Sequence, residues 1–490
     1  MKHLFLLLLL SATTHLSAKD YYVSDFNLRG DGKEMVTVPL QKAIDEISDN
    51  GGGRLVFTPG IYLTGSIHLR TGVELHLLSG ATILGSPDSR DYMAIDNGEG
   101  NTIHDENTSM ALIVAENAKA IKLSGEGTID GNGLAVALCA DSLHHAGILI
   151  DQNYNVRRHR PSTRPKLFHF HKCNHVVVEG LKLRSSAGWG LSFDQCSDLS
   201  LSDLKVENRA YWNNDGIDIS DCQQVYIGNC DVNSADDGIC LKSHSEKTCC
   251  DSIIIEKCQI RSSASAVKFG TASFGGFKNV TVRDIRVQDT FRSAVALECV
   301  DGGTLENVSI ENITAYNTGN AIFIRLGARV DKHPGKLRNV SIKHLFCQVP
   351  FGRPDIDYDL RGPEVDFFHN PFPSSITGIP NNKVRDILIE DVEIVYPGRS
   401  SKGMAYMPLS RLDDVPEVEK GYPEFSMFGE LPSWAFYVRH VDGITFRNVR
   451  MRLVNEDFRP AFVFDDVTGL NLTEVQAEGK SLEKNIYIKE

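Results

Sequence analysis

Two short acidic clusters are the residues in this chain best suited to chemistry. The first, residues 213–218, reads Asn-Asn-Asp-Gly-Ile-Asp, and the second, residues 234–238, reads Ser-Ala-Asp-Asp-Gly. Crowded carboxylates repel one another, which raises the pKa of one member while its neighbours stay ionised. A protonated acid beside an ionised base is what glycoside hydrolysis requires.

Two other uses of such acids have to be weighed. Several carboxylate oxygens can also hold Ca²⁺, and a single Asp-Gly pair most often forms only a turn. Two clusters at a fixed distance, each with a glycine after its acids, favour a site over two unrelated turns. Asp236 and Asp237 can face one side only if a bend interrupts the strand, and Gly216 and Gly238 permit such a bend.

A repeated strand pattern predicts how these clusters are positioned. The motif apolar-x-apolar-x-polar-apolar-x-apolar recurs between positions 176 and 477. Its markers follow one another at nearly even intervals of roughly 25 residues, a period typical of solenoids when no helices intervene. The first of these markers are Gly180, Asp203, Asn229, Lys257, Asp284 and Asn312. A β-propeller does not fit, because its blades are longer than this repeat, and a leucine-rich repeat does not fit, because its ladder of leucines is missing from the sequence. We therefore predict an all-β fold, a single-stranded right-handed parallel β-helix, with the handedness of parallel crossovers.

The interval also explains the spacing of the acidic clusters. The step from Asp215 to Asp236 is a little less than one interval. Strands of neighbouring coils lie about 4.8 Å apart. Matching positions on adjacent coils would therefore place Asp215 and Asp236 side by side, with Asp237 next to them.

The rest of the chain is organised around this stack. Leu40, Ala43, Ile44 and Ile47 have helical spacing and predict a short N-terminal capping helix. The basic start and the apolar run before Ala18 are typical of a signal peptide over residues 1–18, so we expect an exported protein, periplasmic or extracellular. Residues 19–490 are predicted to form a single β-helix domain.

Two long loop insertions are expected in this domain, near residues 350–383 and 396–436. Both segments are rich in aromatic residues. Aromatic rings can form the walls of a sugar-binding cleft or pack as a small satellite core, and the sequence leaves both alternatives open.

The totals exclude several classes of partner. The formal net charge is −13 and no basic run is present, which disfavours nucleic acid. No other segment is long and apolar enough to span a membrane. The 11 cysteines have no CxxC pair or zinc spacing and are predicted to be mostly small core residues. Cys249 and Cys250 are candidates for a disulfide.

Taken together, the motifs resemble those of glycoside hydrolase family 28, the polygalacturonase family. The acidic clusters match its NTDG and DD motifs, and the likeness extends to residues 30–32, 41–44, 51–53, 59–62, 127–131, Trp189 and 237–243. The resemblance implies a right-handed parallel β-helix and an inverting hydrolase acting on pectin, without a metal or other cofactor. It implies that Asp236 is the general acid and that Asp215 and Asp237 activate the water. It places Asn213 and Lys242 in the cleft as substrate-binding neighbours.

The sequence departs from this family where the substrate carboxylate would be held. The Gly-His-Gly motif is absent from residues 265–271, and the Arg-Ile-Lys motif is replaced at residues 294–298, with Ala296 and Glu298 in place of the Arg and the Lys. Arginine and lysine are the usual carboxylate ligands. Lys268, Arg292 and Arg325 could supply positive charge from other positions.

Three functions follow from these observations. The first is a secreted inverting hydrolase of a pectic or related plant cell-wall polysaccharide, with altered specificity and exo action. The second is a calcium-dependent polysaccharide lyase with Lys242 or Lys268 as the base. The third is a non-catalytic glycan-binding β-helix. The predicted site is Asp215, Asp236 and Asp237 for catalysis, with Asn213, Lys242, Lys268, Glu298 and Arg325 for substrate binding.

Overall fold

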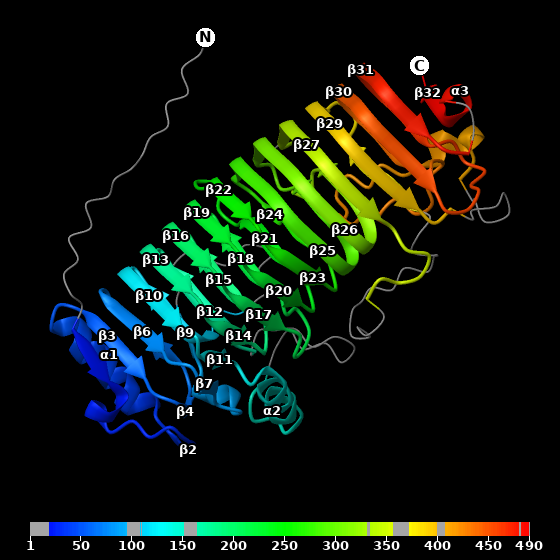
Figure 1. Cartoon of the computed structure of the whole chain (residues 1–490). Helices are drawn as coiled ribbons and strands as arrows, with labels where there is room; N and C mark the ends of the chain where they lie inside the picture. The colour runs from blue at the N-terminus through cyan, green and yellow to red at the C-terminus, as the bar shows by residue number, and fades with distance from the viewer. Residues whose placement is uncertain are drawn as a thin grey trace, which may run out of the picture.

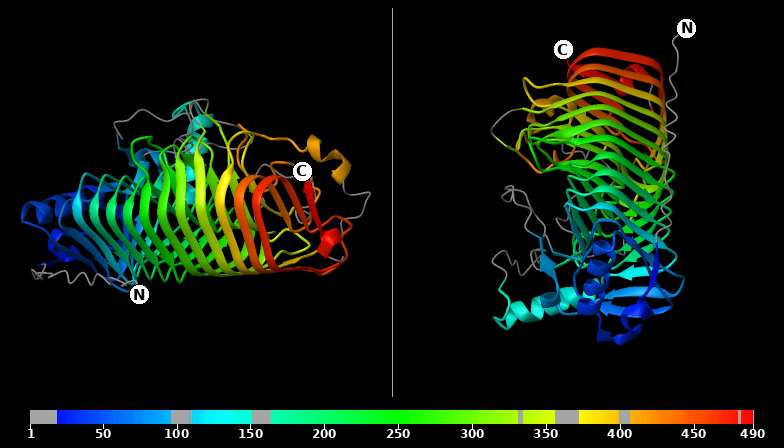
Figure 2. Two further views of the ribbon diagram at one scale, coloured as in Figure 1. Left: turned by 90° about the horizontal axis from the view of Figure 1, so that it is seen from above. Right: turned by 90° about the vertical axis from the view of Figure 1, so that its left-hand side faces the viewer.

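The protein is an elongated stack of β-strand coils (Figures 1 and 2). The computed structural model describes residues 19–95, 108, 110–150, 164–330, 334–355, 372–398, 407–479 and 482–489. The predicted signal peptide at 1–18 lies outside the described residues. All described ladders between strands are parallel except the pairing of β8 (Met93–Ala94) with β9 (Met110–Glu116). This is the parallel β-helix that the repeat predicted.

Each coil contributes to three parallel sheets, which we number by their order along a coil. The first sheet contains β1 (Asp20–Tyr22), β3 (Gly53–Phe57), β6 (Val73–Leu77), β10 (Lys119–Gly125), β13 (Asn174–Glu179), β16 (Ser197–Ser202), β19 (Gln223–Gly228) and β22 (Cys250–Glu256). The second contains β2 (Asp31–Met35), β4 (Gly60–Thr64), β7 (Ala81–Gly85), β11 (Thr128–Asp130), β14 (Lys182–Arg184), β17 (Lys205–Asn208), β20 (Asp231–Ser234) and β23 (Gln259–Ser262).

The third sheet carries the residues of the candidate site. It contains β5 (Ile67–His68), β9, β12 (Lys166–His171), β15 (Leu191–Asp194), β18 (Ile217–Ser220), β21 (Ile239–Ser243), β24 (Val267–Ser273), β28 (Ser374–Thr377) and β32 (Ile486–Lys489). Later strands are long enough to pass through two or three sheets, namely β25 (Gly276–Cys299), β26 (Thr304–Leu326), β27 (Lys336–Gln348), β29 (Val384–Tyr396), β30 (Phe436–Leu453) and β31 (Phe462–Ala477).

Alternation along each strand builds the core and leaves the other face for function. Residues at matching positions of neighbouring coils stack inward and are almost fully buried: Phe168, Leu191, Ile217, Ile239, Val267, Val295 and Ile322. Their neighbours in sequence point to the opposite face, because successive side chains on a strand alternate. The outer face of the third sheet therefore carries a ladder of polar side chains.

The N-terminal end of the stack is covered by α1 (Thr37–Asp49), whose buried side chains are the four predicted from helical spacing. A second helix, α2 (Gly133–His145), was not predicted. Its alanine and leucine residues favour a helix once the solenoid repeat is interrupted. The other helical turns in the described part of the chain are η1 (Val23–Phe26), η2 (Ser89–Asp91), η4 (Leu409–Asp414) and α3 (Leu482–Asn485).

The described residues 407–435 lie along the same side of the stack as α2 (Figure 2). Residues 356–371 and 399–406 lie outside the described residues. Within the first predicted loop, β28 is in fact a strand of the third sheet, since its main chain pairs with β26 and β30. In the second, Phe425 packs with Ala296, Phe323 and Phe372. That part confirms the satellite-core alternative.

The cysteines are mostly core residues, as predicted, and neither Cys249 nor Cys250, the two disulfide candidates, forms a disulfide. All eleven are free thiols, and nine of them are buried. Cys173, Cys196, Cys222 and Cys250 stand at or just before the start of register-matched strands of the first sheet. The Cys250 thiol lies within hydrogen-bonding distance of the main-chain carbonyl oxygens of Ile219 and Lys242.

Candidate active site

Asp215 and Asp237 occupy matching bends on adjacent coils, immediately before β18 and β21. The amide of Gly216 donates to the carbonyl oxygen of Asp237 at 2.9 Å. Ile217 is the register partner of Ile239, so one coil here runs from Ile217 to Ile239. The sequence spacing had matched Asp215 with Asp236. The structure instead brings Asp236 beside Asn214, whose carbonyl oxygen accepts from the Asp236 amide at 3.2 Å.

Glycines allow the two bends to stack this closely. A Cβ atom on Gly216 would lie 2.5 Å from the carbonyl oxygen of Gly238, and one on Gly238 would lie 2.6 Å from that of Ala266. Both distances are below van der Waals contact with main-chain atoms that cannot move aside. The glycines after the acids are thus required by the approach of neighbouring coils, and they let the acids stand one coil spacing apart, about 4.8 Å.

Hydrogen bonds to both the main chain and the side chain of Asp236 fix its position. Its carbonyl oxygen accepts hydrogen bonds from the hydroxyl groups of Ser234 at 2.7 Å and Ser262 at 2.6 Å. Its carboxylate accepts from the Asp237 amide at 3.0 Å and from the Asn213 side-chain amide at 3.5 Å. The bend at residues 235 and 236 satisfies the condition that the sequence imposed for Asp236 and Asp237 to act together.

Lys242 connects Asp215 to a further acid that the predicted site did not include. Its ammonium lies 3.1 Å from Asp215, contacts Asp218 and lies 4.2 Å from the centre of the Trp189 ring. Burial and the charge of Asp218 raise the pKa of Asp215 well above its usual range. Burial also raises the pKa of Asp218, although Lys242 opposes the shift. The alternation Ile217-Asp218-Ile219 was the available signal that Asp218 points outward.

Lys268 joins the next two coils in the same way. Its ammonium lies 3.0 Å from Asp237 and 3.9 Å from Glu298, and it donates to the Tyr422 hydroxyl at 3.4 Å. Burial alone would lower the pKa of Lys268, but the charges of Asp237 and Glu298 raise it well above its usual value. Burial raises the pKa of Glu298 to about 7. Lys268 is therefore a buried cation held between carboxyl groups.

Arg325 belongs to the same ladder, because it is the register partner of Glu298 on the next coil. Its side chain, however, binds main-chain carbonyl oxygens and contacts none of the acids of the candidate site that are described above. Arg325 is 1% exposed, and its guanidinium donates to the carbonyl oxygens of Gly378 at 2.8 Å, Glu417 at 2.8 Å and Val418 at 3.2 Å. The contacts of Arg325 fasten the segment 417–424 to the outer face of the third sheet.

Segment 417–424 crosses that face next to Lys268. The Ala328 amide donates to the carbonyl oxygen of Glu419 at 2.8 Å, and Arg292 forms an ion pair with Glu424. Tyr422 stays 47% exposed beside Lys268. The aromatic residue is thus a wall of the face that carries the acids. Nothing in the sequence pattern could place Tyr422 there, because it is 154 residues from Lys268.

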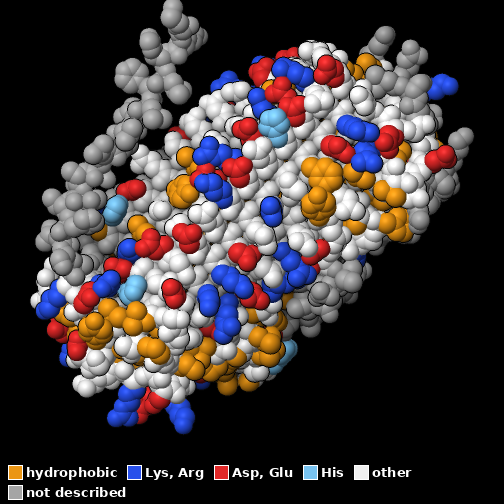
Figure 3. All heavy atoms as spheres, viewed as in Figure 1, with side chains coloured by type: hydrophobic (Ala, Val, Ile, Leu, Met, Phe, Trp, Pro, Cys, Tyr) orange, Lys and Arg blue, Asp and Glu red, His pale blue; other side chains and the backbone are white. Residues whose placement is uncertain are grey.

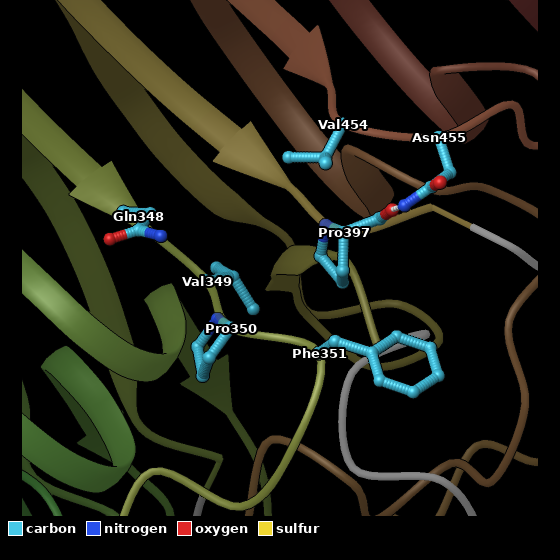
Figure 4. Close-up of a pocket in the computed structure, with 7 residues that line it drawn as sticks. All are labelled: Gln348, Val349, Pro350, Phe351, Pro397, Val454 and Asn455. Carbon is cyan, nitrogen blue, oxygen red and sulfur yellow. Dashed lines mark hydrogen bonds between the residues drawn. The ribbon is translucent and has the colours of Figure 1, made fainter.

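The described residues show neither a metal cluster nor a membrane helix. Among them no group of three or more His, Cys, Asp or Glu side chains is arranged to hold a metal ion. In that same part of the chain, no helix has the length and apolar character needed to cross a membrane. A hollow of about 290 Å³ lies at the ends of β27, β29 and β30 (Figure 4). Its lining is Gln348, Val349, Pro350, Phe351, Pro397, Val454 and Asn455, which offers no acid or base.

Comparison with known proteins identifies the family. Residues 77–327, more than half of the chain, match the model of glycosyl hydrolases family 28. The chain is 25% identical over 317 residues to a polygalacturonase from Persea americana, covering 62% of this chain and 61% of that protein. It is 23% identical over 259 residues to an exo-poly-alpha-D-galacturonosidase from Dickeya chrysanthemi, covering 47% of this chain and 43% of that protein. The chain thus spans about six tenths or less of the length of these curated relatives.

Solved structures agree on the fold. A family 28 exopolygalacturonase from Yersinia enterocolitica aligns with a TM-score of 0.64 and 17% identity, over 96% of this chain and 77% of that one. An exopolygalacturonase from Thermotoga maritima aligns with a TM-score of 0.54 and 22% identity, over 77% of this chain and 87% of that one. With its parallel β-helix and the matched residues 77–327, which contain both acidic clusters, the chain belongs to glycoside hydrolase family 28.

Proposed function

We propose that this protein is an inverting glycoside hydrolase that cleaves a pectic or related plant cell-wall polysaccharide. The observation that carries the proposal is the juxtaposition of Asp215, Asp236 and Asp237 at stacked bends on one outer face. Inversion needs a proton donor on one side of the bond and a base-activated water on the other. Three carboxyl groups on adjacent coils supply both, and family 28 membership makes glycoside hydrolysis the first reaction to test.

We assign the general acid to Asp236 and water activation to Asp215 and Asp237. The contact of Lys268 with Asp237 supports this assignment, because a neighbouring cation favours the ionised form that a base needs. Asp215 is the second candidate for the acid, since burial and Asp218 raise its pKa. A substrate with an activated leaving group distinguishes Asp236 from Asp215 as the general acid. Such a leaving group departs without a proton, so loss of the true acid should spare the cleavage of this substrate.

The proposed specificity differs from that of an ordinary polygalacturonase. Ala296 and Glu298 occupy the outward positions where the family motif has an Arg and a Lys. The nearby cations are committed elsewhere, since Lys268 contacts Asp237 and Glu298, and Arg325 holds main-chain carbonyls. A uronate carboxylate at this end would face carboxyl groups. We therefore expect a neutral sugar there, or a uronate held by other contacts.

We further propose exo action and export. Segment 417–424 lies across the outer face of the third sheet beside Lys268 and Arg292. A barrier at one end of a cleft admits a chain end more readily than the middle of a polymer. Export is proposed from the leader-like residues 1–18 alone.

The lyase alternative is less well supported by the chemistry of the lysines. A lyase base must be neutral to accept a proton. Burial would lower the pKa of Lys242, but the charges of Asp218 and Asp215 raise it well above its usual value. The same balance holds for Lys268. Both side chains therefore remain protonated at neutral pH, which suits charge compensation of acids more than proton abstraction.

One experiment distinguishes the three functions. The full chain is incubated with a panel of pectic polysaccharides and side-chain glycans, with and without EDTA, and the products are separated by chromatography. Saturated sugars released one unit at a time, unaffected by EDTA and with an inverted anomeric centre by NMR, support the proposal. Unsaturated products that disappear with EDTA would favour the lyase, and binding without turnover would favour the glycan-binding protein.

A further inference from the structure

A groove lies on the outer face of the second sheet, around the turn from the acidic clusters. It has a volume of about 340 Å³ and crosses β23, β25 and β26. Its lining residues are Gln259, Arg286, Val287, Gln288, Thr314 and Tyr316. None of them takes part in the candidate active site. On the face that Figure 3 shows, hydrophobic side chains gather in two groups, one over the long strands and one over the N-terminal coils.

The strand register makes this groove run along the axis of the stack. Gln259, Arg286 and Thr314 are successive register partners on three coils, and Thr314 is followed by Phe346 on the fourth. Gln288 is the register partner of Tyr316 in the adjacent column. Successive coils are about 4.8 Å apart. A ligand in the groove would therefore be extended and would contact a repeating series of side chains.

An aromatic platform forms one end of the groove. Tyr316 is 51% exposed, and its ring centre lies 5.3 Å from that of Phe346 at an interplanar angle of 52°. Two rings held side by side on the outside of a rigid sheet contribute nothing to the core. Exposed apolar groups gathered on a folded protein commonly mark a binding surface. An aromatic face with a polar rim suits the apolar face and hydroxyl groups of a sugar ring.

The polar groups beside the platform select for an anionic ligand. Gln259 and Gln288 offer amide donors and acceptors. Arg286 is exposed and forms no ion pair among the residues that the structure describes. The acids closest to the platform in the register are engaged, since Asp289 accepts from Asn317 at 2.6 Å and Glu393 pairs with Arg452 at 3.1 Å. The groove thus presents an available guanidinium on a protein of net charge −13.

We propose that this groove is a second polysaccharide-binding surface, which holds an extended acidic glycan through Tyr316, Phe346 and Arg286 away from the acidic clusters. This proposal rests on the proposed function only for the choice of a polysaccharide as the ligand. β23 leads through the bend at residues 263 and 264 into β24, so the groove and the acid-bearing face are consecutive faces of the same coils. A polymer held on the second sheet would stay close to the acids between cleavage events.

Affinity electrophoresis tests this proposal without turnover. The full chain carrying Asp236→Asn is run through gels containing polygalacturonate, and the same protein with Tyr316→Ala or Arg286→Ala is compared. Tyr316→Ala is expected to weaken retention by about three- to tenfold, the contribution typical of an aromatic contact. Arg286→Ala should weaken it as well, and its effect should shrink as salt is added. Matched controls are Tyr22→Ala and Arg385→Ala, which change exposed residues elsewhere.

The remaining outcomes are equally decisive. Wild-type and Tyr316→Ala proteins should cleave short oligosaccharides at equal rates, while the KM for polymer rises in the variant. Retention unchanged in Tyr316→Ala, or reduced equally in Tyr22→Ala, would overturn the proposal, as would binding of neutral galactan as tight as that of polygalacturonate. If the wild-type protein cleaves nothing yet Tyr316→Ala still loses retention, the proposed function fails and this surface stands.

Discussion

The ammonium of Lys268 lies 3.0 Å from the carboxylate of Asp237, which belongs to the preceding coil. This ion pair joins a residue that the family resemblance assigns to water activation with a lysine in residues 265–271, the stretch where the family's Gly-His-Gly motif is absent. Both side chains are buried, at 3% and 6% exposure. Breaking a buried pair leaves a charge uncompensated, so the contact controls both the ionisation of Asp237 and the local stability.

Lys268→Met should therefore move the pH dependence of turnover. Lys268 contacts Asp237, and a neighbouring cation favours the ionised form of a carboxyl group. Without that cation, the acidic limb of the kcat/KM profile should shift to higher pH, because Asp237 must be ionised to act as a base. The measurement is kcat/KM from pH 4 to 9. Lys182→Met, an exposed lysine on the second sheet, is the control, and an unshifted limb would remove Asp237 from the role of base.

Asp236→Asn should abolish turnover of natural substrates. Loss of a general acid costs at least about a hundredfold in rate. The fold should persist, because the side-chain oxygen of an asparagine can still accept from the Asp237 amide, and the hydrogen bonds to the main-chain carbonyl of residue 236 do not involve the side chain. Activity on an aryl glycoside with an activated leaving group should survive in Asp236→Asn and be lost in Asp215→Asn. The reverse pattern would assign the acid to Asp215. Asp203→Asn, at an exposed turn, serves as the control.

Glu298 should make stability depend on pH. Its pKa rises from 4.5 to about 7 on folding because the carboxyl group is buried. Between these values the unfolded chain has released the proton that the folded protein retains, so the free energy of unfolding falls as pH rises through this window. The free energy of unfolding should fall by roughly 3 kcal/mol across this pH window, since that is the free energy equivalent to a pKa shift of this extent.

Glu298→Gln should flatten that decrease, since an amide cannot ionise. Urea unfolding between pH 4.5 and 8 measures the dependence of the free energy of unfolding on pH. Glu207→Gln, which changes an exposed residue of the second sheet, is the control. A residual slope is expected from Asp221, whose pKa burial also raises to about 7. Parallel profiles for the wild type and Glu298→Gln would show that Glu298 does not retain its proton in the folded protein.

Arg325→Lys should loosen segment 417–424. A lysine cannot reach the carbonyl oxygens of Gly378, Glu417 and Val418 at once, because it lacks the planar fork of the guanidinium. Trypsin should then cut after the exposed Lys420 faster than in the wild type. Mass spectrometry of the first fragments checks the position. Arg385→Lys, outside the segment, is the control, and equal cutting rates would show that other contacts hold the wall.

Much of the fold follows from the sequence because a solenoid repeats its own pattern. Alternation and the nearly even repeat predicted the stacked coils, and the helical spacing of Leu40 and Ile47 predicted α1. The helix α2 and the strand β28 were missed, since both lie where the repeat is interrupted by other segments. The site was predicted in part: Asp215, Asp236, Asp237 and Lys242 come together as expected, and Asp218 joins them.

By itself the sequence determined that three acids would meet on one outer face, because alternation and coil length are local properties. Tertiary structure decided which acids are register partners, since a small difference in coil length pairs Asp215 with Asp237 instead of Asp236. It also decided what surrounds them. Lys268 became a partner of Asp237, Arg325 became an anchor of segment 417–424, and Tyr422 became a wall. Those contacts join residues up to 154 positions apart, and no local pattern encodes such distances.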